Sequence, residues 1–427
     1  MRVARDNPYV RTGVYLARSI VYAVVIGAAG ACIAWAFDTS LGWLSEATRR
    51  WWLFGLPVAG AAVCSLISRW YPVVRSDGIQ QYIYACREKG YELPPMTAPA
   101  KFAASLATLA SGGSGGKVGP VVLTGGAVGR ALTRVLPWTD EKDHQEATAC
   151  GAAAAVGALL GCPLGGGLFA VEVMYESSID YRGLFGAVLC STAAFFFRQT
   201  VLPIKSYFVE SSHSFTLDHL LPVLAGTALA GLVGLAFVSL YALARRASDR
   251  AGRFAWLTPT AGAVGCVALA WVCGPELMGV GENLLRSAWM GELALSAGLL
   301  LLAGKLLATV STVGSGGSGG LFFPAAVLGS LCGTVVCGLF GFEDVTMRHM
   351  VTAASVSATL ASMLNAPIAA AVIQIELYGV GVAPAAVLGS VLGYLIGRPK
   401  VAYRYASPRA KGVAPLTSRP ASPGEAD

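Results

Sequence analysis

Two glycine-rich runs hold the residues best suited to chemistry in this chain. Ser111–Pro120 reads SGGSGGKVGP and Ser315–Pro324 reads SGGSGGLFFP, and the two runs are identical at seven of ten positions. A glycine-rich turn that opens a helix leaves backbone N–H groups without partners, with the positive end of the helix dipole behind them. Such a turn binds an anion without a cationic side chain. The runs therefore predict two backbone anion sites.

Three other interpretations fit the runs less well. Gly116 and Lys117 resemble part of a nucleotide-binding GxxxxGK[ST] loop, but Ser111 stands in place of its first glycine and Val118 follows the lysine. Close helix packing of the GxxxG kind explains part of the glycine content, but the runs are too dense in glycine to be helical. A flexible linker does not suit an uncharged stretch. The anion interpretation is therefore favoured.

The composition indicates an integral membrane protein. Of the 427 residues, 55% are hydrophobic and 13% are charged, whereas a soluble domain carries roughly 25% charged residues. A soluble enzyme, a nucleic-acid-binding protein and a disordered scaffold are poor fits to these values. By the positive-inside rule, basic residues before the first apolar span and after the last place both termini in the cytoplasm. These residues are Arg2, Arg5, Arg11, Arg398, Lys400, Arg404, Arg409, Lys411 and Arg419.

Uncharged stretches long enough to cross a bilayer, about 18 residues, recur along the chain. They follow a first apolar segment, Ile20–Phe37, which we interpret as a retained helix and not a signal peptide. Gly314–Gly320 interrupts one long stretch, and Pro163 and Pro367 interrupt two others. Interrupted helices at matching places in two halves indicate a transport site. The stretches are Trp51–Ser68, Ala149–Val171, Leu220–Ala244, Phe254–Pro275, Leu306–Phe342, Met350–Ile375 and Leu377–Gly397.

The offset of 204 residues that relates the glycine runs also superposes Leu160–Glu172 on Leu364–Glu376 without a gap. The chain is therefore interpreted as two homologous halves, 1–215 and 216–404, followed by a polar cytoplasmic tail, 405–427, that we expect to be disordered. The two glycine runs should meet at the interface of the halves, near the bilayer midplane. Glu172 and Glu376 are equivalent acids in apolar surroundings, and their symmetry favours a shared structural role over a functional one.

Metal and redox chemistry are not predicted. The ten cysteines lie singly in apolar stretches, and the four histidines form no metal-binding spacing with them. We expect these cysteines to be small buried side chains and expect no metal site and no cofactor. Neither a cluster of nucleophiles nor paired acids indicates an enzyme. A membrane-embedded enzyme, a carrier of small organic anions and a purely structural protein are the alternatives from other classes.

At these residues the chain resembles the CLC family of chloride channels and transporters, the voltage-gated chloride channel family, over nearly its whole length. Gly116–Pro120 resembles the family's G(K/R)EGP, Gly319–Pro324 resembles GGxFxP, and Ser76–Ile79 falls where the family has GSGIP. The resemblance implies an all-α integral membrane protein with two inverted-topology repeats of tilted, partly broken helices. It also implies a multi-pass, lipid-embedded homodimer of the bacterial inner (plasma) membrane, with one pore for chloride or similar small anions in each subunit, no cytoplasmic regulatory domains and no nucleic-acid partner.

The departures from the family pattern bear on mechanism. Val118 stands where the family has the gating glutamate, and Val173 stands where exchangers often have an internal glutamate. Valine has neither a charge to compete with chloride nor a proton to exchange. These residues favour passive, channel-like chloride conduction; the alternative is chloride/proton exchange through other proton-carrying residues. The fluoride-selective branch typically has GGEVTP where this chain has GGLFFP, which favours chloride over fluoride.

The remaining site residues are also assigned through the resemblance. Asp77 aligns with the family's pore serine, and it would point away from the anion, be neutral, or leave the role to Ser76; a solvated loop acid is a further interpretation. Tyr403 is expected to be the pore tyrosine, with Tyr405 as second choice. Lys117 is expected to attract incoming anions. The other residues expected along the anion path are Gly78, Ile79, Gly116, Gly119, Leu321 and Phe322.

Overall fold

The computed structural model describes residues 8–88, 91, 93–94, 96–134, 141–175, 181–202 and 215–403. Within these ranges the regular secondary structure is helical, apart from one isolated antiparallel bridge between Gly116 and Gly320. The expected tail and Tyr405 lie outside the described residues.

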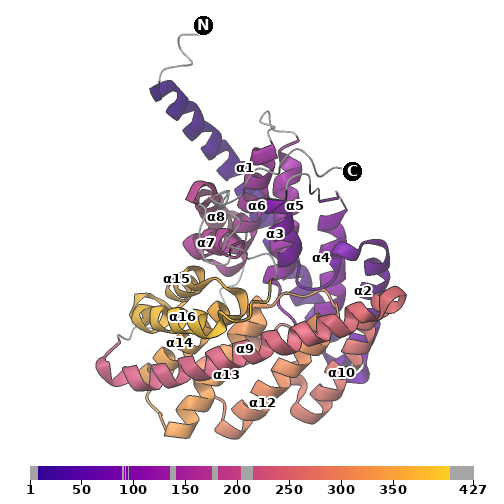
Figure 1. Ribbon diagram of the computed structural model, residues 1–427, viewed down its shortest axis with the longest axis vertical. Helices are drawn as coiled ribbons and strands as arrows, with labels where there is room; N and C mark the ends of the chain where they lie inside the picture. Colours follow the sequence, from indigo (N-terminus) through magenta and orange to yellow (C-terminus); the bar gives the residue numbers. More distant parts are fainter. Residues whose placement is uncertain are drawn as a thin grey trace, which may run out of the picture.

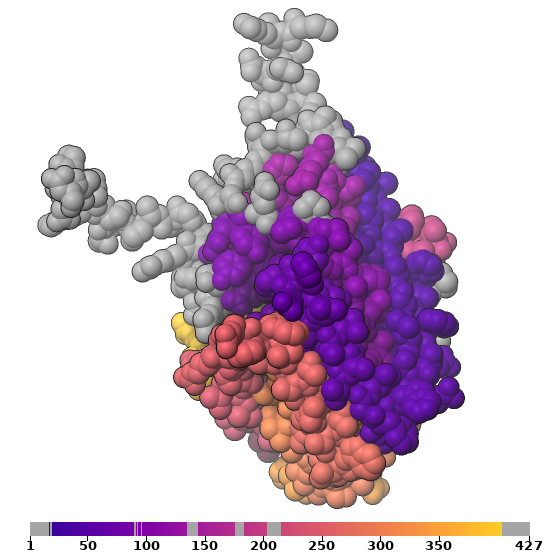
Figure 2. Space-filling model, turned by 90° about the vertical axis from the view of Figure 1, so that its right-hand side faces the viewer, coloured from indigo at the N-terminus to yellow at the C-terminus, as the bar shows by residue number. Residues whose placement is uncertain are grey.

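The helices occur twice in the same order. The described part of the first half contains α1 (Pro8–Thr48), α2 (Leu56–Trp70), α3 (Ile79–Arg87), α4 (Thr97–Ala110), α5 (Val118–Leu132), α6 (Glu141–Leu160), α7 (Pro163–Glu172) and α8 (Tyr181–Val201). The second half contains α9 (Leu220–Arg250), α10 (Thr258–Cys273), α11 (Glu282–Met290), α12 (Leu295–Thr309), α13 (Phe322–Phe340), α14 (Val345–Leu364), α15 (Pro367–Tyr378) and α16 (Ala383–Gly397). Figures 1 and 2 show the halves packed against each other, indigo to magenta against pink to yellow.

Seven helical segments among the described residues are long and apolar enough to cross a membrane. Large apolar side chains on several of them, among them Phe196, Leu232 and Trp271, are exposed, as a surface against lipid chains requires. The segments are Ser19–Phe54, Gly183–Val201, Leu217–Arg250, Gly252–Cys273, Leu295–Gly314, Phe322–Phe340 and Val380–Gly397.

Three of the uncharged stretches that are long enough to cross a bilayer do not form single helices in the structure. The 3₁₀ turn η2 (Arg49–Phe54) and Gly55, whose φ is +88°, separate the tryptophans of Trp51–Ser68 from α2. Ala149–Val171 is divided between α6 and α7, and Met350–Ile375 between α14 and α15. In both of these the second helix begins at the expected proline, because proline at the first helical position has no N–H to leave unpaired.

The two glycine runs meet, as the sequence predicts. The amide of Gly116 donates to the carbonyl of Gly320 at 2.7 Å, and the amide of Gly320 donates back to the carbonyl of Gly116 at 2.5 Å. These residues are equivalent under the offset of 204. Because an antiparallel bridge between equivalent residues places a two-fold axis between them, the two runs cross in opposite directions.

Further contacts around this axis occur in equivalent pairs. The hydroxyl of Ser114 bonds that of Thr309 at 2.9 Å, and the hydroxyl of Ser105 bonds that of Ser318 at 2.8 Å. Under the offset of 204, Ser114 is equivalent to Ser318 and Thr309 is equivalent to Ser105, so the two pairs are equivalent to each other. Each buried hydroxyl pair therefore joins one glycine run to a helix of the other half, α12 or α4, without a buried charge.

The equivalent acids also act as a pair. The Glu172 carboxylate of α7 accepts the amides of Ile368 (2.9 Å) and Ala369 (2.6 Å) at the start of α15. The Glu376 carboxylate of α15 accepts the amides of Leu164 (2.9 Å) and Gly165 (2.7 Å) at the start of α7. Each acid therefore caps the helix that carries the other, across the interface of the halves. The structural role expected from their symmetry is confirmed.

Candidate anion-binding site

Three helix N-termini converge beside the Gly116–Gly320 bridge, those of α3, α5 and α13. Their backbones touch at Gly119, in the first turn of α5. A Cβ atom at this glycine would collide with the carbonyl oxygen of Asp77, which precedes α3, and would lie 2.9 Å from the Cα of Gly320, which precedes α13. Only glycine at position 119 allows this approach.

These three N-termini have no side-chain cap. The N-cap residues of α3, α5 and α13 are Gly78, Lys117 and Leu321, and none makes a capping side-chain bond within the described part of the chain. The first turns contain no acidic residue either. The first-turn amides of an α-helix have no intrahelical acceptor and lie at the positive end of its dipole. This arrangement can hold a small anion through backbone amides.

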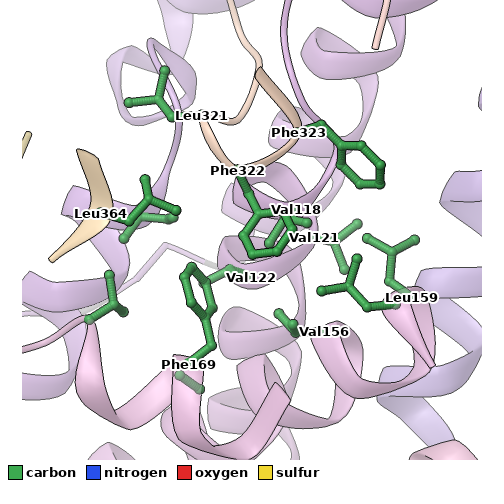
Figure 3. Packing of buried hydrophobic residues seen from close by; sticks show 14 of the residues in the cluster. Val118, Val121, Val122, Val156, Leu159, Phe169, Leu321, Phe322, Phe323 and Leu364 are labelled. Carbon is green, nitrogen blue, oxygen red and sulfur yellow. The ribbon is translucent and has the colours of Figure 1, made fainter. Parts of the chain in front are cut away.

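The side chains at the starts of α5 and α13 form an apolar wall. Val118 is fully buried, and Figure 3 shows it beside Phe322, with Val121 and Val122 on the same helix. The ring of Phe322 meets that of Phe169 edge to face, with the ring centroids 5.6 Å apart. This wall excludes water from the amides, which strengthens their electrostatic attraction for an anion.

Asp77 and Tyr403 come together next to the start of α3, although they lie far apart in the chain. Both are only 2% exposed, and the Tyr403 hydroxyl faces the Asp77 carboxyl group. Apart from this contact, neither the Asp77 Oδ2 atom nor the Tyr403 hydroxyl has a hydrogen-bond partner among the described residues. Asp77 is therefore not the solvated loop acid that the sequence left open.

Ser76 is turned to a different partner. Its φ of +70° is unusual for a non-glycine residue, and its hydroxyl lies 2.5 Å from the hydroxyl of Tyr241 on α9. The backbone carbonyl of Ser76 accepts from the Lys101 Nζ atom of α4 at 2.6 Å. The hydroxyl of Ser76, the residue that could supply the pore hydroxyl, therefore bonds Tyr241, and Asp77, which aligns with the pore serine, faces Tyr403.

Lys117 lies between two carboxylates. Its ammonium group pairs with the carboxylates of Asp38 on α1 and Glu282 at the start of α11, and it lies 5.2 Å from the ring centroid of Phe323. Two carboxylates around one ammonium group leave a net negative charge. These ion pairs oppose an attraction of incoming anions by Lys117, which stays a prediction.

Two cavities of opposite charge open into the protein. The acidic cavity, about 460 Å³, is lined by the charged residues Asp38, Glu46, Arg49, Lys117, Glu276 and Glu282. The basic cavity, about 480 Å³, is lined by Arg245, Arg246, Asp249 and Lys400. Its wall also includes Tyr241, which bonds Ser76, and Ala402, the neighbour of Tyr403. The basic cavity therefore reaches the surroundings of Asp77.

Val173 is fully buried just after α7. The neighbouring acid, Glu172, uses both of its carboxylate oxygens to cap α15, which leaves it in a structural position. Among the described residues, no group of three His, Cys, Asp or Glu side chains is placed to hold a metal ion, and the ten cysteines are unbridged.

Sequence reasoning missed several residues around the site. Lys101 and Lys305 are fully buried, and each Nζ atom donates to two backbone carbonyls of the loop before α3 or α11. Their separation of 204 residues was a signal that could have found them. Tyr241, Arg245 and Asp38 gave no such signal, because each reaches the site from a distant helix.

The fold and the site define a helical integral membrane protein whose two halves are related by a two-fold axis, with three uncapped helix N-termini at their junction. The family model described as voltage gated chloride channel matches residues 59–398. The match covers most of the chain, which therefore belongs to the voltage-gated chloride channel, or CLC, family.

The similar proteins include transporters of this family. The chain is 26% identical to an H(+)/Cl(-) exchange transporter of Vibrio campbellii over 386 residues, or 83% of this chain and 81% of that protein. It is 27% identical to an uncharacterized protein of Methanocaldococcus jannaschii over 300 residues, or 70% of this chain and 74% of that protein.

Solved structures share the fold. A CLC-type fluoride/proton antiporter superposes with a TM-score of 0.82 and 23% identity, covering 92% of this chain and 98% of that one. A slow cyanobacterial Cl-/H+ antiporter superposes with a TM-score of 0.77 and 20% identity, covering 90% and 94%. The expected all-α CLC fold is confirmed.

Proposed function

We propose that this protein transports chloride across a membrane in exchange for protons. The observation that carries the chloride assignment is the meeting of three uncapped helix N-termini at Gly119, behind an apolar wall and close to a basic cavity. A site made of amide dipoles holds a dehydrated anion weakly enough to release it, which transport requires.

The exchange mode is supported by the named relatives. Several Vibrio proteins that match this chain at 26–29% identity are called H(+)/Cl(-) exchange transporters. These relatives favour chloride/proton exchange over uncoupled conduction. Uncoupled conduction is the second candidate, and the specific observation in its favour is the buried valine at position 118.

The site residues enter this proposal as follows. The first-turn backbone of α3, α5 and α13 supplies the amides, at Gly78–Ile79, Val118–Gly119 and Leu321–Phe322. Tyr403 is the pore tyrosine, and Val118 and Val173 occupy the positions of the two glutamates. Gly116 fixes the junction through its bridge to Gly320.

The assembly and orientation follow from the family resemblance and the distribution of charge. We assign the basic cavity, which lies beside Lys400, to the cytoplasmic side together with both termini. The protein would be a homodimer in the inner (plasma) membrane of a bacterium, with one pathway in each subunit. The division into 1–215, 216–404 and the tail 405–427 belongs to the same proposal.

Flux from proteoliposomes with opposed chloride and pH gradients tests the function. Exchange predicts that a chloride gradient drives protons uphill, with the proton movement stopping when chloride is replaced by an impermeant anion. Chloride flux without uphill proton movement would contradict exchange and leave uncoupled conduction. A chloride flux no greater than that of protein-free liposomes would contradict both modes.

A further inference from the structure

The backbone of Asp77 lies at the junction of the three helix N-termini, and its carboxyl group lies beside Tyr403. The Asp77 backbone touches Gly119 of α5. The Asp77 Oδ2 atom and the Tyr403 hydroxyl are buried next to each other, and apart from this contact neither has a hydrogen-bond partner among the described residues. Two such polar atoms at uncapped helix N-termini indicate a place where a ligand is held.

The cationic groups near Asp77 do not form an ion pair with its carboxyl group. Lys101 of α4 and Arg245 of α9 are close enough to act on the carboxyl group electrostatically. However, the ion pairs of the described part of the chain do not include Asp77. The Lys101 ammonium group donates instead to the carbonyls of Val74 and Ser76.

The other elements around Asp77 contribute either a tyrosine hydroxyl group or a first turn without an acidic residue. The hydroxyl of Tyr241, on α9, is bonded to that of Ser76, and Tyr403 follows α16. The first turns of α3, α5 and α13 contain no acidic residue. Asp38 and Glu282, the acids near the start of α5, pair with Lys117, whereas the Asp77 carboxyl group lies beside the Gly78 amide at the start of α3.

We propose that the Asp77 carboxyl group competes with the transported anion, so that chloride binds beside Tyr403 only when Asp77 is protonated. An ionised carboxylate can only accept hydrogen bonds, and its charge repels an anion. A neutral carboxylic acid has an O–H donor. Together with the Tyr403 hydroxyl, it offers two O–H donors to the same anion.

The proton reaches Asp77 from the basic cavity. A hydronium ion in this cavity transfers one proton to a carboxylate oxygen, which leaves a water molecule and a neutral acid, and chloride then binds without any covalent change. The walls of the cavity include Gln80, Tyr241 and Ala402, each next to or bonded to a residue around Asp77. Chloride binding is thereby linked to the uptake of one proton. This inference rests on the proposed chloride function and names a titratable group for it.

Isothermal titration calorimetry of the purified full-length protein with chloride tests the linkage. We expect the wild-type protein to bind chloride more tightly at about pH 5 than at about pH 8, across the range in which carboxyl groups titrate in proteins. Titrations near neutral pH in buffers of different ionisation enthalpy should show the uptake of about one proton per bound chloride.

Two variants and a control locate the effect. Asp77→Asn and Asp77→Ser should bind chloride about tenfold more tightly than wild type near neutral pH, because the repulsion is removed. Their affinities should not depend on pH, and proton uptake should be lost. Asp218→Asn removes an exposed carboxylate of the turn η4 (Leu217–His219) and should keep the wild-type behaviour.

The outcomes distinguish this inference from the proposed function. Chloride binding by wild type that is independent of pH, or proton uptake that persists in both Asp77 variants, would overturn the role of Asp77 alone. If wild type binds no chloride at either pH, the chloride function itself is overturned as well. If one of the two Asp77 variants does not elute as a single species, the other variant is used, since serine and asparagine differ in size and in hydrogen bonding.

Discussion

The two halves of this protein can be compared position by position at the offset of 204 residues. Lys101 and Lys305 are equivalent, and both are buried with their Nζ atoms bonded to two loop carbonyls. Glu172 and Glu376 are equivalent, and both cap a helix of the opposite half. These equivalent residues build the frame that holds the broken helices together.

The residues around the uncapped helix N-termini break this equivalence. Val118 corresponds to Phe322, and Lys117, which is ion-paired, corresponds to the apolar Leu321. The two cavities also differ, one acidic and one basic. The equivalent polar residues bond to backbone groups of the fold. In the function that we propose, the residues that differ between the halves face the pathway and give it direction.

The largest effect is expected from breaking an equivalent pair. Glu172→Ala removes two charge-assisted bonds to the start of α15, each worth about 1.5–3 kcal/mol. Thermal unfolding in detergent, followed by the loss of the monodisperse peak in size-exclusion chromatography, should occur at a clearly lower temperature. Glu376→Ala is the matched variant and should behave in the same way. If one change has no effect on stability, the two caps are not equivalent.

The next effect concerns the junction of the three N-termini. Gly119→Ala places a methyl group against the Asp77 carbonyl, and such overpacking costs about 1–3 kcal/mol. Chloride flux in proteoliposomes should be lost because the amides are displaced. Gly183→Ala on α8 is the control, since nothing lies within 4 Å of the added carbon. Full flux in Gly119→Ala would show that this junction is not on the pathway.

A third prediction restores the missing gate. Val118→Glu adds a carboxylate at the uncapped start of α5, where it competes with chloride for the amides. Flux should slow by about tenfold near neutral pH and recover as the pH falls and the carboxylate is protonated. Val118→Gln is the uncharged control and should show no such pH dependence. Unchanged flux in Val118→Glu would place position 118 outside the pore.

The smallest effect is expected in the acidic cavity. Glu282→Gln removes one of the two carboxylates around Lys117 and makes the cavity less repulsive to anions. Chloride flux at low salt should rise by about twofold, and the difference should vanish at high ionic strength through screening. A fall in flux would contradict this expectation. It would mean that the ion pair of Glu282 with Lys117 stabilises the structure more than its charge repels anions.

Repeats and helix breaks could be predicted from the sequence because they depend on local residue types. Gly314–Gly320, Pro163 and Pro367 marked the breaks, and the register of Glu172 and Glu376 indicated a shared structural role. The two matching glycine runs were also predicted to meet, since transport sites lie at the interface of two repeats. These features require no knowledge of contacts between distant helices.

What the sequence did not predict depends on such contacts. The ion pairs of Lys117 were not predicted because its partners, Asp38 and Glu282, are 79 and 165 residues away in the chain. The roles of Ser76 and Asp77 remained open because the direction of each side chain depends on the positive φ of Ser76. Trp51–Ser68 was wrongly expected to be one span because the left-handed backbone at Gly55 separates it into two pieces.

The central claim is that an anion binds where α3, α5 and α13 begin. Anomalous X-ray diffraction from crystals grown with bromide in place of chloride tests this claim most directly, since bromide is a heavier halide of similar size. We expect an anomalous peak within hydrogen-bonding distance of the first-turn amides of α5 and α13, near the Tyr403 hydroxyl. Bromide peaks confined to other parts of the protein would contradict it.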